Sequence, residues 1–249
     1  MPVIARGRIR FLLTVLLSLS IGAFAQKPAT SLPEDRYEYG RANREGIGKI
    51  YMGREISHVM GHRGAGWLER SEREREERTD LLIENLPIGP GDSVADIGAG
   101  TGYFALPMAR LVGDTGTVYA VDIQPEMLAI IEDRAAAQDV SNIELVLGTA
   151  NDPKLPEDSI NMVLFVDAYH EFEWPWEVMS AVYDSLVPGG KVILIEYRAE
   201  DRRVPIRKLH KMTERQARAE MEAIGLRFVE NDDFLPQQHF LVFEKPASP

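Results

Sequence analysis

The chain contains no cysteine among its 249 residues. It therefore has no means to form a disulfide or a thiolate zinc site, and it offers neither a thiol nucleophile nor a cysteine for lipid attachment. Basic residues are also outnumbered, because 28 lysines and arginines stand against 39 aspartates and glutamates and leave a formal charge of −11. A general nucleic-acid binder normally carries a basic surface, so we expect no nucleic-acid partner.

Long apolar runs are scarce, and the run at the N-terminus, Phe11 to Phe24, is too short to span a membrane comfortably. Three arginines at positions 6, 8 and 10 precede it, and it ends in Ala23-Phe24-Ala25, which is typical of a cleavage site. We interpret residues 1–25 as a secretory signal peptide. We therefore expect an exported protein, periplasmic or secreted, with no stable membrane span once the signal is cleaved. The alternative is an uncleaved anchor, which would still place the rest of the chain outside the cytoplasm because positive charge stays inside.

The remaining length, with 45% hydrophobic residues overall, suffices for one domain and an appendage. We expect an N-terminal extension over residues 26–68 and a main domain over residues 69–249. In the main domain strand-like and helix-like segments alternate, which predicts an α/β fold with a mostly parallel sheet and helices on both faces. The expected strands are 93–97, 118–122, 143–147, 159–166, 191–197, 226–230 and 239–244, and the expected helices are 103–112, 125–138, 175–186 and 212–224. The sequence carries no signal for the oligomeric state.

Three glycines at alternate positions, Gly98, Gly100 and Gly102, follow the first of these strands. Glycines there let the backbone turn sharply and let a ligand approach bare main chain. The spacing is G-x-G-x-G and differs from the dinucleotide fingerprint G-x-G-x-x-G. Asp96, just before the first glycine, would repel a pyrophosphate but would attract an ammonium or lie comfortably near a sulfonium. S-adenosylmethionine (SAM) carries both cations and no phosphate, so it fits this pattern, whereas a nicotinamide dinucleotide is disfavoured.

Two further segments follow the glycine run in order. The next strand ends in Asp122, 24 positions after Gly98, where an acid can accept both ribose hydroxyls of a nucleoside. A Pro-Gly-Gly turn at 188–190 then leads into another expected strand. Together, D-I-G-A-G-T-G, Y-A-V-D and L-V-P-G-G-K-V resemble the class I SAM-dependent methyltransferases over about residues 81–244.

The resemblance implies a Rossmann-like sheet of seven strands with an antiparallel last strand, SAM as the cofactor, and a small molecule as methyl acceptor. It also implies that Arg54 to Trp67 forms a lid, since N-terminal extensions of this fold commonly cover the cofactor cleft. Ligands of an open α/β sheet bind at the carboxyl ends of the strands. The expected cofactor-binding residues are therefore Asp96, Gly98, Ala99, Gly100, Gly102, Asp122, Ile123, Thr149, Ala150 and Asp167.

Thr149 departs from the resembled pattern. Relatives often have Gly-Asp-Ala after the third strand, where the acid accepts from the adenine amino group, and this chain has Gly148-Thr149-Ala150 instead. Asn151 or Asp152 could supply the missing contact. Equally, the Asp-Pro pair at 152–153 could serve only to shape a turn.

The residues after the fourth strand, Tyr169, His170 and Glu171, are the candidate catalytic residues, because in the resembled fold this segment lies beside the transferable methyl group. Methyl transfer is an in-line displacement in which positioning does most of the work, and a base is needed only when the nucleophile must lose a proton. His170 suits that role near neutral pH, and Glu171 could orient or replace it. Tyr169 and Trp174 would face the substrate. Alternatively, His170 only caps the strand end, and Trp174 and Trp176 pack in the core.

Three other charged features of the sequence are candidate sites. His58 and His62 stand four positions apart, but Gly61 weakens a helix there and no third ligand is near, so we expect no metal site. The charge run at 72–78 is interpreted as the solvated, mutually paired face of a helix over residues 69–86. The basic stretch at 202–211 could receive an anionic substrate group or could be a solvated loop.

These observations predict a SAM-dependent methyltransferase (EC 2.1.1.-) with an unidentified small-molecule acceptor. The lack of cysteine excludes a cysteine-based arsenite methyltransferase mechanism. Export raises the question of how SAM, which is made in the cytoplasm, would reach the protein. The alternative function comes from a different class: a non-catalytic ligand-binding protein on a methyltransferase scaffold outside the cytoplasm.

Overall fold

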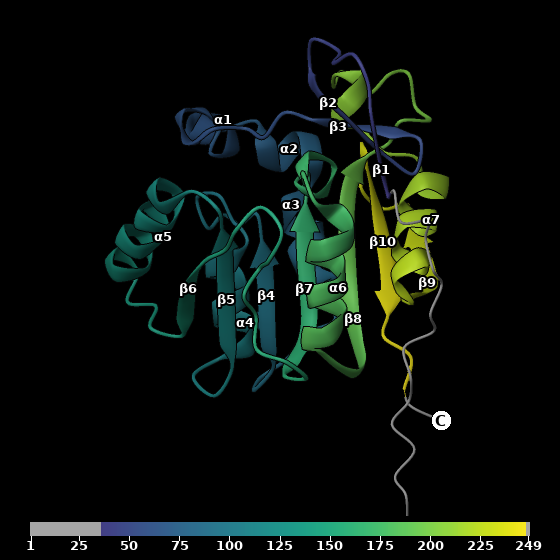
Figure 1. Ribbon diagram of the computed structural model, residues 1–249. Helices are drawn as coiled ribbons and strands as arrows, with labels where there is room; N and C mark the ends of the chain where they lie inside the picture. The colour runs from purple at the N-terminus through teal and green to yellow at the C-terminus, as the bar shows by residue number, and fades with distance from the viewer. Residues whose placement is uncertain (1–35, 248–249) are drawn as a thin grey trace, which may run out of the picture.

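A computed structural model describes residues 36–247 (Figure 1). The expected signal peptide, residues 1–25, and the first part of the N-terminal extension lie outside the described residues. Within residues 36–247, no helix is long and apolar enough to cross a membrane.

Seven strands form the central sheet in the order β6-β5-β4-β7-β8-β10-β9. Neighbouring strands from β6 to β8 pair in parallel, and β10 pairs antiparallel with both β8 and β9. The predicted fold class, an α/β Rossmann-like sheet with an antiparallel last strand, is confirmed. The bounds are β4 (Ser93–Ile97), β5 (Thr117–Asp122), β6 (Ile143–Leu147), β7 (Ile160–Val166), β8 (Leu186–Tyr197), β9 (Arg227–Asp232) and β10 (Gln238–Glu244).

Helices cover both faces of this sheet (Figure 1). Successive side chains of a strand point to opposite faces, so Val94 of β4 joins one hydrophobic cluster and Ala95 joins the other. Because both faces are covered, the central strands are apolar almost throughout. The first cluster includes residues of α4 (Ala105–Val112) and α5 (Pro125–Ala137), and the second includes residues of α6 (Pro175–Ser185) and α7 (Glu214–Ile224).

A separate antiparallel sheet of three strands precedes the main domain, and the sequence analysis did not anticipate it. Its strands are β1 (Tyr37–Tyr39), β2 (Gly46–Tyr51) and β3 (Arg54–Ser57). Met52 and Gly53 connect β2 to β3, and both have a positive φ, as a tight two-residue hairpin turn requires. In Figure 1 this sheet lies at the end of the main sheet where the arrows of β7 and β8 point. It therefore stands beside the edge where ligands of such sheets bind.

The helix predicted over residues 69–86 is two short helices, α2 (Arg73–Glu77) and α3 (Thr79–Glu84), because Arg78 between them adopts a left-handed conformation. The prediction that the charge run is a solvated face is wrong for two of its members. Arg73 is 4% exposed and Glu77 is 2% exposed. Arg73 Nε donates to Glu77 Oε2 at 2.9 Å, and the Tyr197 hydroxyl donates to Glu77 Oε1 at 2.8 Å. The charges are mutually paired as predicted, but the pair is part of the interior.

Four short helical segments lie between the longer elements of the described residues. They are η1 (His62–Gly64), α1 (Ala65–Leu68), η2 (Tyr169–Glu171) and η3 (Lys208–His210). Of these, η2 follows β7 and carries the predicted catalytic residues, whereas η3 lies in the basic stretch.

Candidate functional site

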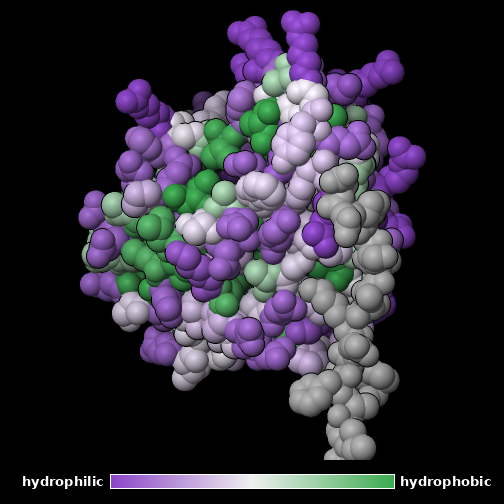
Figure 2. All heavy atoms as spheres, in the orientation of Figure 1, coloured by the Kyte–Doolittle hydropathy of each residue, from purple (hydrophilic) through white to green (hydrophobic). Residues whose placement is uncertain are grey.

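A cavity of about 690 Å³ opens at the carboxyl ends of the parallel strands, where an open α/β sheet binds its ligands. Its volume lies within the range of about 300–1,000 Å³ that is usual for small-molecule sites. The wall comes from the loops after β4, β5, β6 and β7, from α2, from the segment before η3 and from the N-terminal extension. Figure 2 shows the surface in the same orientation, with hydrophobic residues gathered toward the β5–β6 side of the molecule.

Most of the predicted site residues meet in this wall. Gly98, Gly100, Asp122, Ile123, Thr149, Ala150, Asp167, His170 and Glu171 line the cavity, whereas Asp96, Ala99, Gly102 and Tyr169 do not.

The glycine loop after β4 is closely packed at the two positions that line the cavity. Gly98 and Gly100 have φ angles of 76° and 53°, which favour glycine. A Cβ on Gly98 would lie 2.8 Å from the Cβ of Ala168, and one on Gly100 would lie 2.7 Å from Leu68 Cδ1. The loop therefore presents bare main chain to the cavity.

Asp122 ends β5 and fixes the position of the glycine loop. The Gly100 N–H donates to its Oδ2 at 2.9 Å, and the Gln124 N–H donates to its Oδ1 at 2.9 Å. Burial raises the pKa of Asp122 above its usual value, while the two backbone donors favour the ionised form. Its carboxylate lines the cavity and retains lone pairs for a further donor, such as a ribose hydroxyl.

Asp96 is buried at the end of β4, directly before the glycine loop, and differs from the expectation that it touches the ligand. It is 2% exposed, and its Oδ2 has no hydrogen-bond partner. Burial, and then the charge of Asp122, raise the pKa of Asp96 to about 7, although Arg73 acts in the opposite direction. Asp96 can therefore affect ligand binding only through its charge, since it does not line the cavity.

Asp167 follows β7 with a φ of 49° and does line the cavity. Its N–H donates to the Ile195 carbonyl at 2.9 Å, and Gln238 Nε2 donates to its Oδ2 at 2.7 Å, but its Oδ1 is buried without a partner. Burial and the nearby charges of Glu77 and Glu196 raise its pKa well above the usual value. A carboxylate oxygen in this situation is suited to a cationic ligand.

Together these residues fit SAM. The glycine loop offers main chain that a Cβ would obstruct, Asp122 offers an acceptor for ribose, and Asp96 and Asp167 each have a buried oxygen without a partner. Two of these carboxylates have a pKa raised by desolvation together with neighbouring negative charge, so a ligand with positive charge would relieve that repulsion.

The residues after β6 form a turn, which favours one of the two interpretations of Asp152. The Lys154 N–H donates to Asp152 Oδ1 at 2.7 Å, and Thr149 Oγ1 donates to Asn151 Oδ1 at 2.9 Å. Neither Asn151 nor Asp152 lines the cavity. An adenine group at this wall would therefore meet Thr149 and Ala150 and no carboxylate.

His170 is 2% exposed and stands at the centre of a hydrogen-bonded chain of side chains. Its Nδ1 lies 2.7 Å from Glu196 Oε2, and its Nε2 lies 3.1 Å from His210 Nδ1. Its backbone N–H donates to the other oxygen of Glu196 at 3.1 Å. Glu171 Oε1 lies 3.8 Å from His170 Nε2 and 3.5 Å from His210 Nδ1. His170 lines the cavity, so this network can move a proton at the cavity wall.

Tyr169 and Trp174 do not face the cavity, contrary to the expectation. The Tyr169 hydroxyl donates to Glu220 Oε2 at 2.7 Å, and its ring packs on Phe165 and Phe172 in the core. The Trp174 ring lies under Lys49, whose Nζ is 3.0 Å from the ring centroid. Both aromatic residues therefore support η2 and the N-terminal sheet from outside the site.

Glu196 and His210 belong to the site, and the sequence analysis did not identify their roles. Glu196 stands inside the apolar strand β8 and is 0% exposed, and a charge buried in such a strand is a signal for a specific partner. His210 was counted only as part of the basic stretch. Of that stretch, Arg207 and His210 line the cavity.

The N-terminal extension lies against the cavity opening. Val59, Met60 and Trp67 line the cavity. The Met60 N–H donates to Glu171 Oε2 at 2.9 Å, Gln124 Nε2 donates to the Met60 carbonyl at 3.0 Å, and the His62 N–H donates to Gln124 Oε1 at 2.7 Å.

Deeper in the structure, Arg54 of β3 joins the extension to the main domain. It pairs with Glu220 at 2.9 Å and donates from Nη1 to the His170 carbonyl at 3.0 Å. In the described part of the chain, His58 and His62 belong to no group of three metal-ligating side chains.

Residues 94–190 match a family model described as a methyltransferase domain. The chain is 31% identical over 107 residues to an arsenite methyltransferase from Halobacterium salinarum and 30% identical over 116 residues to the ubiquinone/menaquinone biosynthesis C-methyltransferase UbiE from a Marinomonas species. The matches cover 43% and 46% of this chain and 27% and 46% of the relatives. The chain therefore matches less than half the length of either relative.

The fold is similar to the crystal structure of a SAM-dependent methyltransferase from Aquifex aeolicus, with a TM-score of 0.70 at 18% identity. The similarity covers 75% of this chain and 99% of that chain, and at this identity it shows the fold. These comparisons support a class I SAM-dependent methyltransferase domain in the matched region, with SAM as its cofactor.

Proposed function

We propose that this protein is a SAM-dependent methyltransferase (EC 2.1.1.-) that acts on a small-molecule acceptor bound beside His170 and Glu171. One observation carries the proposal: the glycine loop and Asp122, which suit SAM, line the same cavity as a buried histidine held by a carboxylate. A protein that only bound a nucleoside would need the glycine loop and Asp122 but not the buried histidine and its carboxylate.

The glycine loop and three carboxylates would bind and orient the cofactor. The main chain at Gly98 and Gly100 would lie against it, and Asp122 would accept from its ribose hydroxyls. Asp167, with Asp96 behind the wall, would balance its positive charge. When bound, SAM supplies a methyl group activated by the positive charge of its sulfonium.

His170 is the candidate base for an acceptor that must lose a proton. A neutral imidazole that donates from Nδ1 to Glu196 leaves its Nε2 as the proton acceptor, and Glu196 stabilises the ring once it is protonated. His210 lies 3.1 Å from the same Nε2 and can take part in the transfer. Glu171 borders both rings from the cavity wall.

The methyl acceptor of neither relative can be assigned directly to this chain. The chain has no cysteine, so a cysteine-based reaction with arsenite is not available to it. The name of the second relative refers to ubiquinone and menaquinone biosynthesis, so a quinone precursor is one small molecule to try first.

Calorimetry with SAM and with its demethylated product tests the cofactor site. We expect both to bind the wild-type protein and to bind Asp122→Asn at least about tenfold more weakly, because a carboxylate is lost from the ribose contact. Asp152→Asn is the matched control, since that carboxylate holds a turn outside the cavity. If neither compound binds the wild type, the proposed function is wrong.

Transfer of a labelled methyl group from SAM to compounds in a cell extract tests catalysis. We expect a labelled small molecule with the wild type and a loss of at least about 100-fold in rate with His170→Gln, as is usual for an acid–base group. Tight cofactor binding without any labelled product would instead support the non-catalytic binding protein.

We further propose that the protein acts outside the cytoplasm, on the basis of the signal-like residues 1–25. Fusion of residues 1–30 to a reporter that is active only outside the cytoplasm should give an active reporter. Replacing the three arginines at positions 6, 8 and 10 by glutamate should reduce that activity. A silent reporter would contradict export and remove the question of how SAM is supplied.

A further inference from the structure

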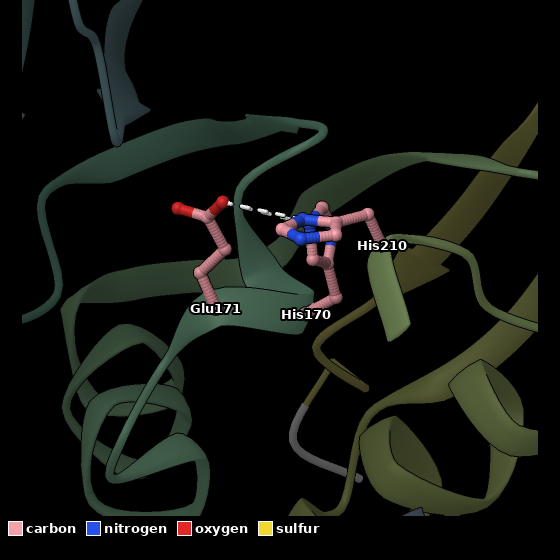
Figure 3. A group of neighbouring side chains, drawn as sticks. All are labelled: His170, Glu171 and His210. Carbon is pink, nitrogen blue, oxygen red and sulfur yellow. Dashed lines mark hydrogen bonds and ion pairs between the residues drawn. The ribbon is translucent and has the colours of Figure 1, made fainter. Parts of the chain in front are cut away.

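Three side chains on the cavity wall hold atoms that could ligate a metal close to one another. His170 and Glu171 come from η2, His210 comes from η3, and Figure 3 shows the Glu171 carboxylate directed toward the pair of imidazole rings. One ligand atom from each residue lies within 4.8 Å of the other two. We propose that His170, Glu171 and His210 form a binding site for a divalent transition-metal ion of the Zn²⁺ class.

The separations of the ligand atoms match those of a coordinated ion. His170 Nε2 and His210 Nδ1 are 3.1 Å apart, and Glu171 Oε1 is 3.8 Å from the first and 3.5 Å from the second. Ligands about 2.0–2.1 Å from a tetrahedral zinc ion are separated from one another by about 3.3 Å. The two rings are nearly perpendicular, with an interplanar angle of 82°, and their nitrogens still approach each other.

The groups behind the three ligands hold them in the orientation that an ion needs. Glu196 Oε2 lies 2.7 Å from His170 Nδ1, which fixes the ring with Nε2 toward the cluster. This is the carboxylate–histidine arrangement that supports metal-binding histidines elsewhere. Met60 donates its N–H to Glu171 Oε2 at 2.9 Å, so that oxygen is occupied and Oε1 faces the two rings. Glu196 is fully buried, and both of its oxygens are bound to His170, which offsets the cost of burying the carboxylate.

The donor set identifies the class of ion. Two imidazoles and one carboxylate suit Zn²⁺ and its neighbours in the first transition row, whereas Mg²⁺ and Ca²⁺ prefer oxygen ligands alone. Three protein ligands leave a fourth position open, which is typical of catalytic zinc sites and not of structural ones. All three ligands line the cavity, so the open position faces the space for an acceptor.

The ion would select acceptors by their chemistry, and this part of the inference rests on the proposed function. With the ion bound, His170 Nε2 is a ligand and no longer a free base, so the ion takes over the activation of the acceptor. A hydroxyl or thiol in the open position would have its pKa lowered by the ion and would release its proton to water near neutral pH. The acceptor class would then be small alcohols, phenols or thiols. Binding of the ion itself requires no methyl transfer and can be tested alone.

The test is titration of the full-length protein, stripped with a chelator, with Zn²⁺ in the absence of SAM. We expect one ion per chain and an affinity at least about 100-fold lower in His210→Ala and in Glu171→Gln, because each removes one of three ligands. Glu171→Gln keeps an oxygen that can accept from Met60, so it should fold even if other variants do not. The double variant His58→Ala with His62→Ala is the matched control and should bind Zn²⁺ like the wild type.

Two results would overturn the proposal: no stoichiometric binding to the wild type, or binding that survives in His210→Ala and Glu171→Gln. Thermal unfolding supplies a second readout, since Zn²⁺ should raise the melting temperature of the wild type and of the double control but not that of Glu171→Gln. Calorimetry with SAM on the same samples separates the two proposals. If Zn²⁺ binds and SAM does not, the proposed function fails and the metal site stands. If SAM binds and Zn²⁺ does not, the metal site fails and the proposed function stands.

Discussion

Replacing Asp96 by Asn should make the protein more stable at high pH. Asp96 is fully buried, and its pKa is raised to about 7 from the usual value of 3.8, chiefly by desolvation. Below pH 3.8 the carboxyl is neutral in both the folded and the unfolded chain, so its burial costs nothing extra. As the pH rises the unfolded chain loses this proton first, and the folded state is destabilised progressively until the pH passes about 7.

The full effect is the free energy of moving the pKa from 3.8 to about 7, which is about 4 kcal/mol at 1.36 kcal/mol for each pKa unit. Asn is close to Asp in shape and carries no charge, so Asp96→Asn should raise the free energy of unfolding by up to about 4 kcal/mol at pH 8 and by almost nothing at pH 4. The amide group adds a donor where Asp96 Oδ2 has no partner, and this lowers the expected gain by about 1–3 kcal/mol.

The assay is urea unfolding of both proteins at a series of pH values between about pH 4 and pH 8.5, the window in which the linkage acts. Asp167 titrates in both proteins and cancels in the difference between the two curves, whereas Asp122 is coupled to Asp96 by charge repulsion, so the difference reports Asp96 together with that coupling. Asp114→Asn, at an exposed position, controls for the loss of one negative charge. If the curves of the wild type and Asp96→Asn run parallel over this range, the carboxylate is not strained by burial and the reasoning is refuted.

Four further outcomes follow from the same contacts. The affinity of the wild type for SAM should weaken as the pH falls below about 7, where Asp96 takes up a proton, and calorimetry should show a smaller pH dependence in Asp96→Asn. Arg54→Met should lower the free energy of unfolding by about 3–5 kcal/mol because it leaves the buried Glu220 without its positively charged partner. The control is the exposed ion pair between Arg203 and Asp201, where Arg203→Met should lower the free energy of unfolding by less than about 1 kcal/mol. Equal losses for the two variants in urea unfolding would contradict the argument. Gly100→Ala should weaken SAM binding at least about tenfold, whereas Gly53→Ala, also at positive φ but with open space around it, should change only stability, by about 1 kcal/mol. Glu196→Gln should reduce Zn²⁺ affinity about 10–100-fold without unfolding the protein, because an amide no longer fixes the His170 tautomer, and an unchanged affinity would remove Glu196 from the site.

The main sheet could be predicted from the sequence because its strands carry strong local signals. β4 and β6 begin and end at the predicted residues, and β5 differs by one residue. Glycine and proline mark where these strands begin, and continuous apolar runs reflect burial on both faces. β8 is the exception, since it begins at Leu186, which pairs with Ile160, and it continues through Pro-Gly-Gly at 188–190 with a shift of register. A pairing partner 26 residues away leaves no local signal in the sequence.

The site could be predicted only where its residues follow strands. Gly98, Asp122, Asp167 and His170 were found by that rule, and all of them line the cavity. His210 was not, because only the folded chain brings it within 3.1 Å of a residue 40 positions earlier. The burial of Arg73 and Glu77 was missed for a related reason, since a charge run gives no indication that Tyr197, far along the chain, completes a buried pair.

Gln124 ties the entrance of the cavity to the cofactor residues. Its N–H donates to Asp122, and its side chain holds Met60 and His62 of the N-terminal extension. The placement of the N-terminal extension and the position of the ribose acceptor therefore depend on one residue, so a change at Gln124 would alter both at once.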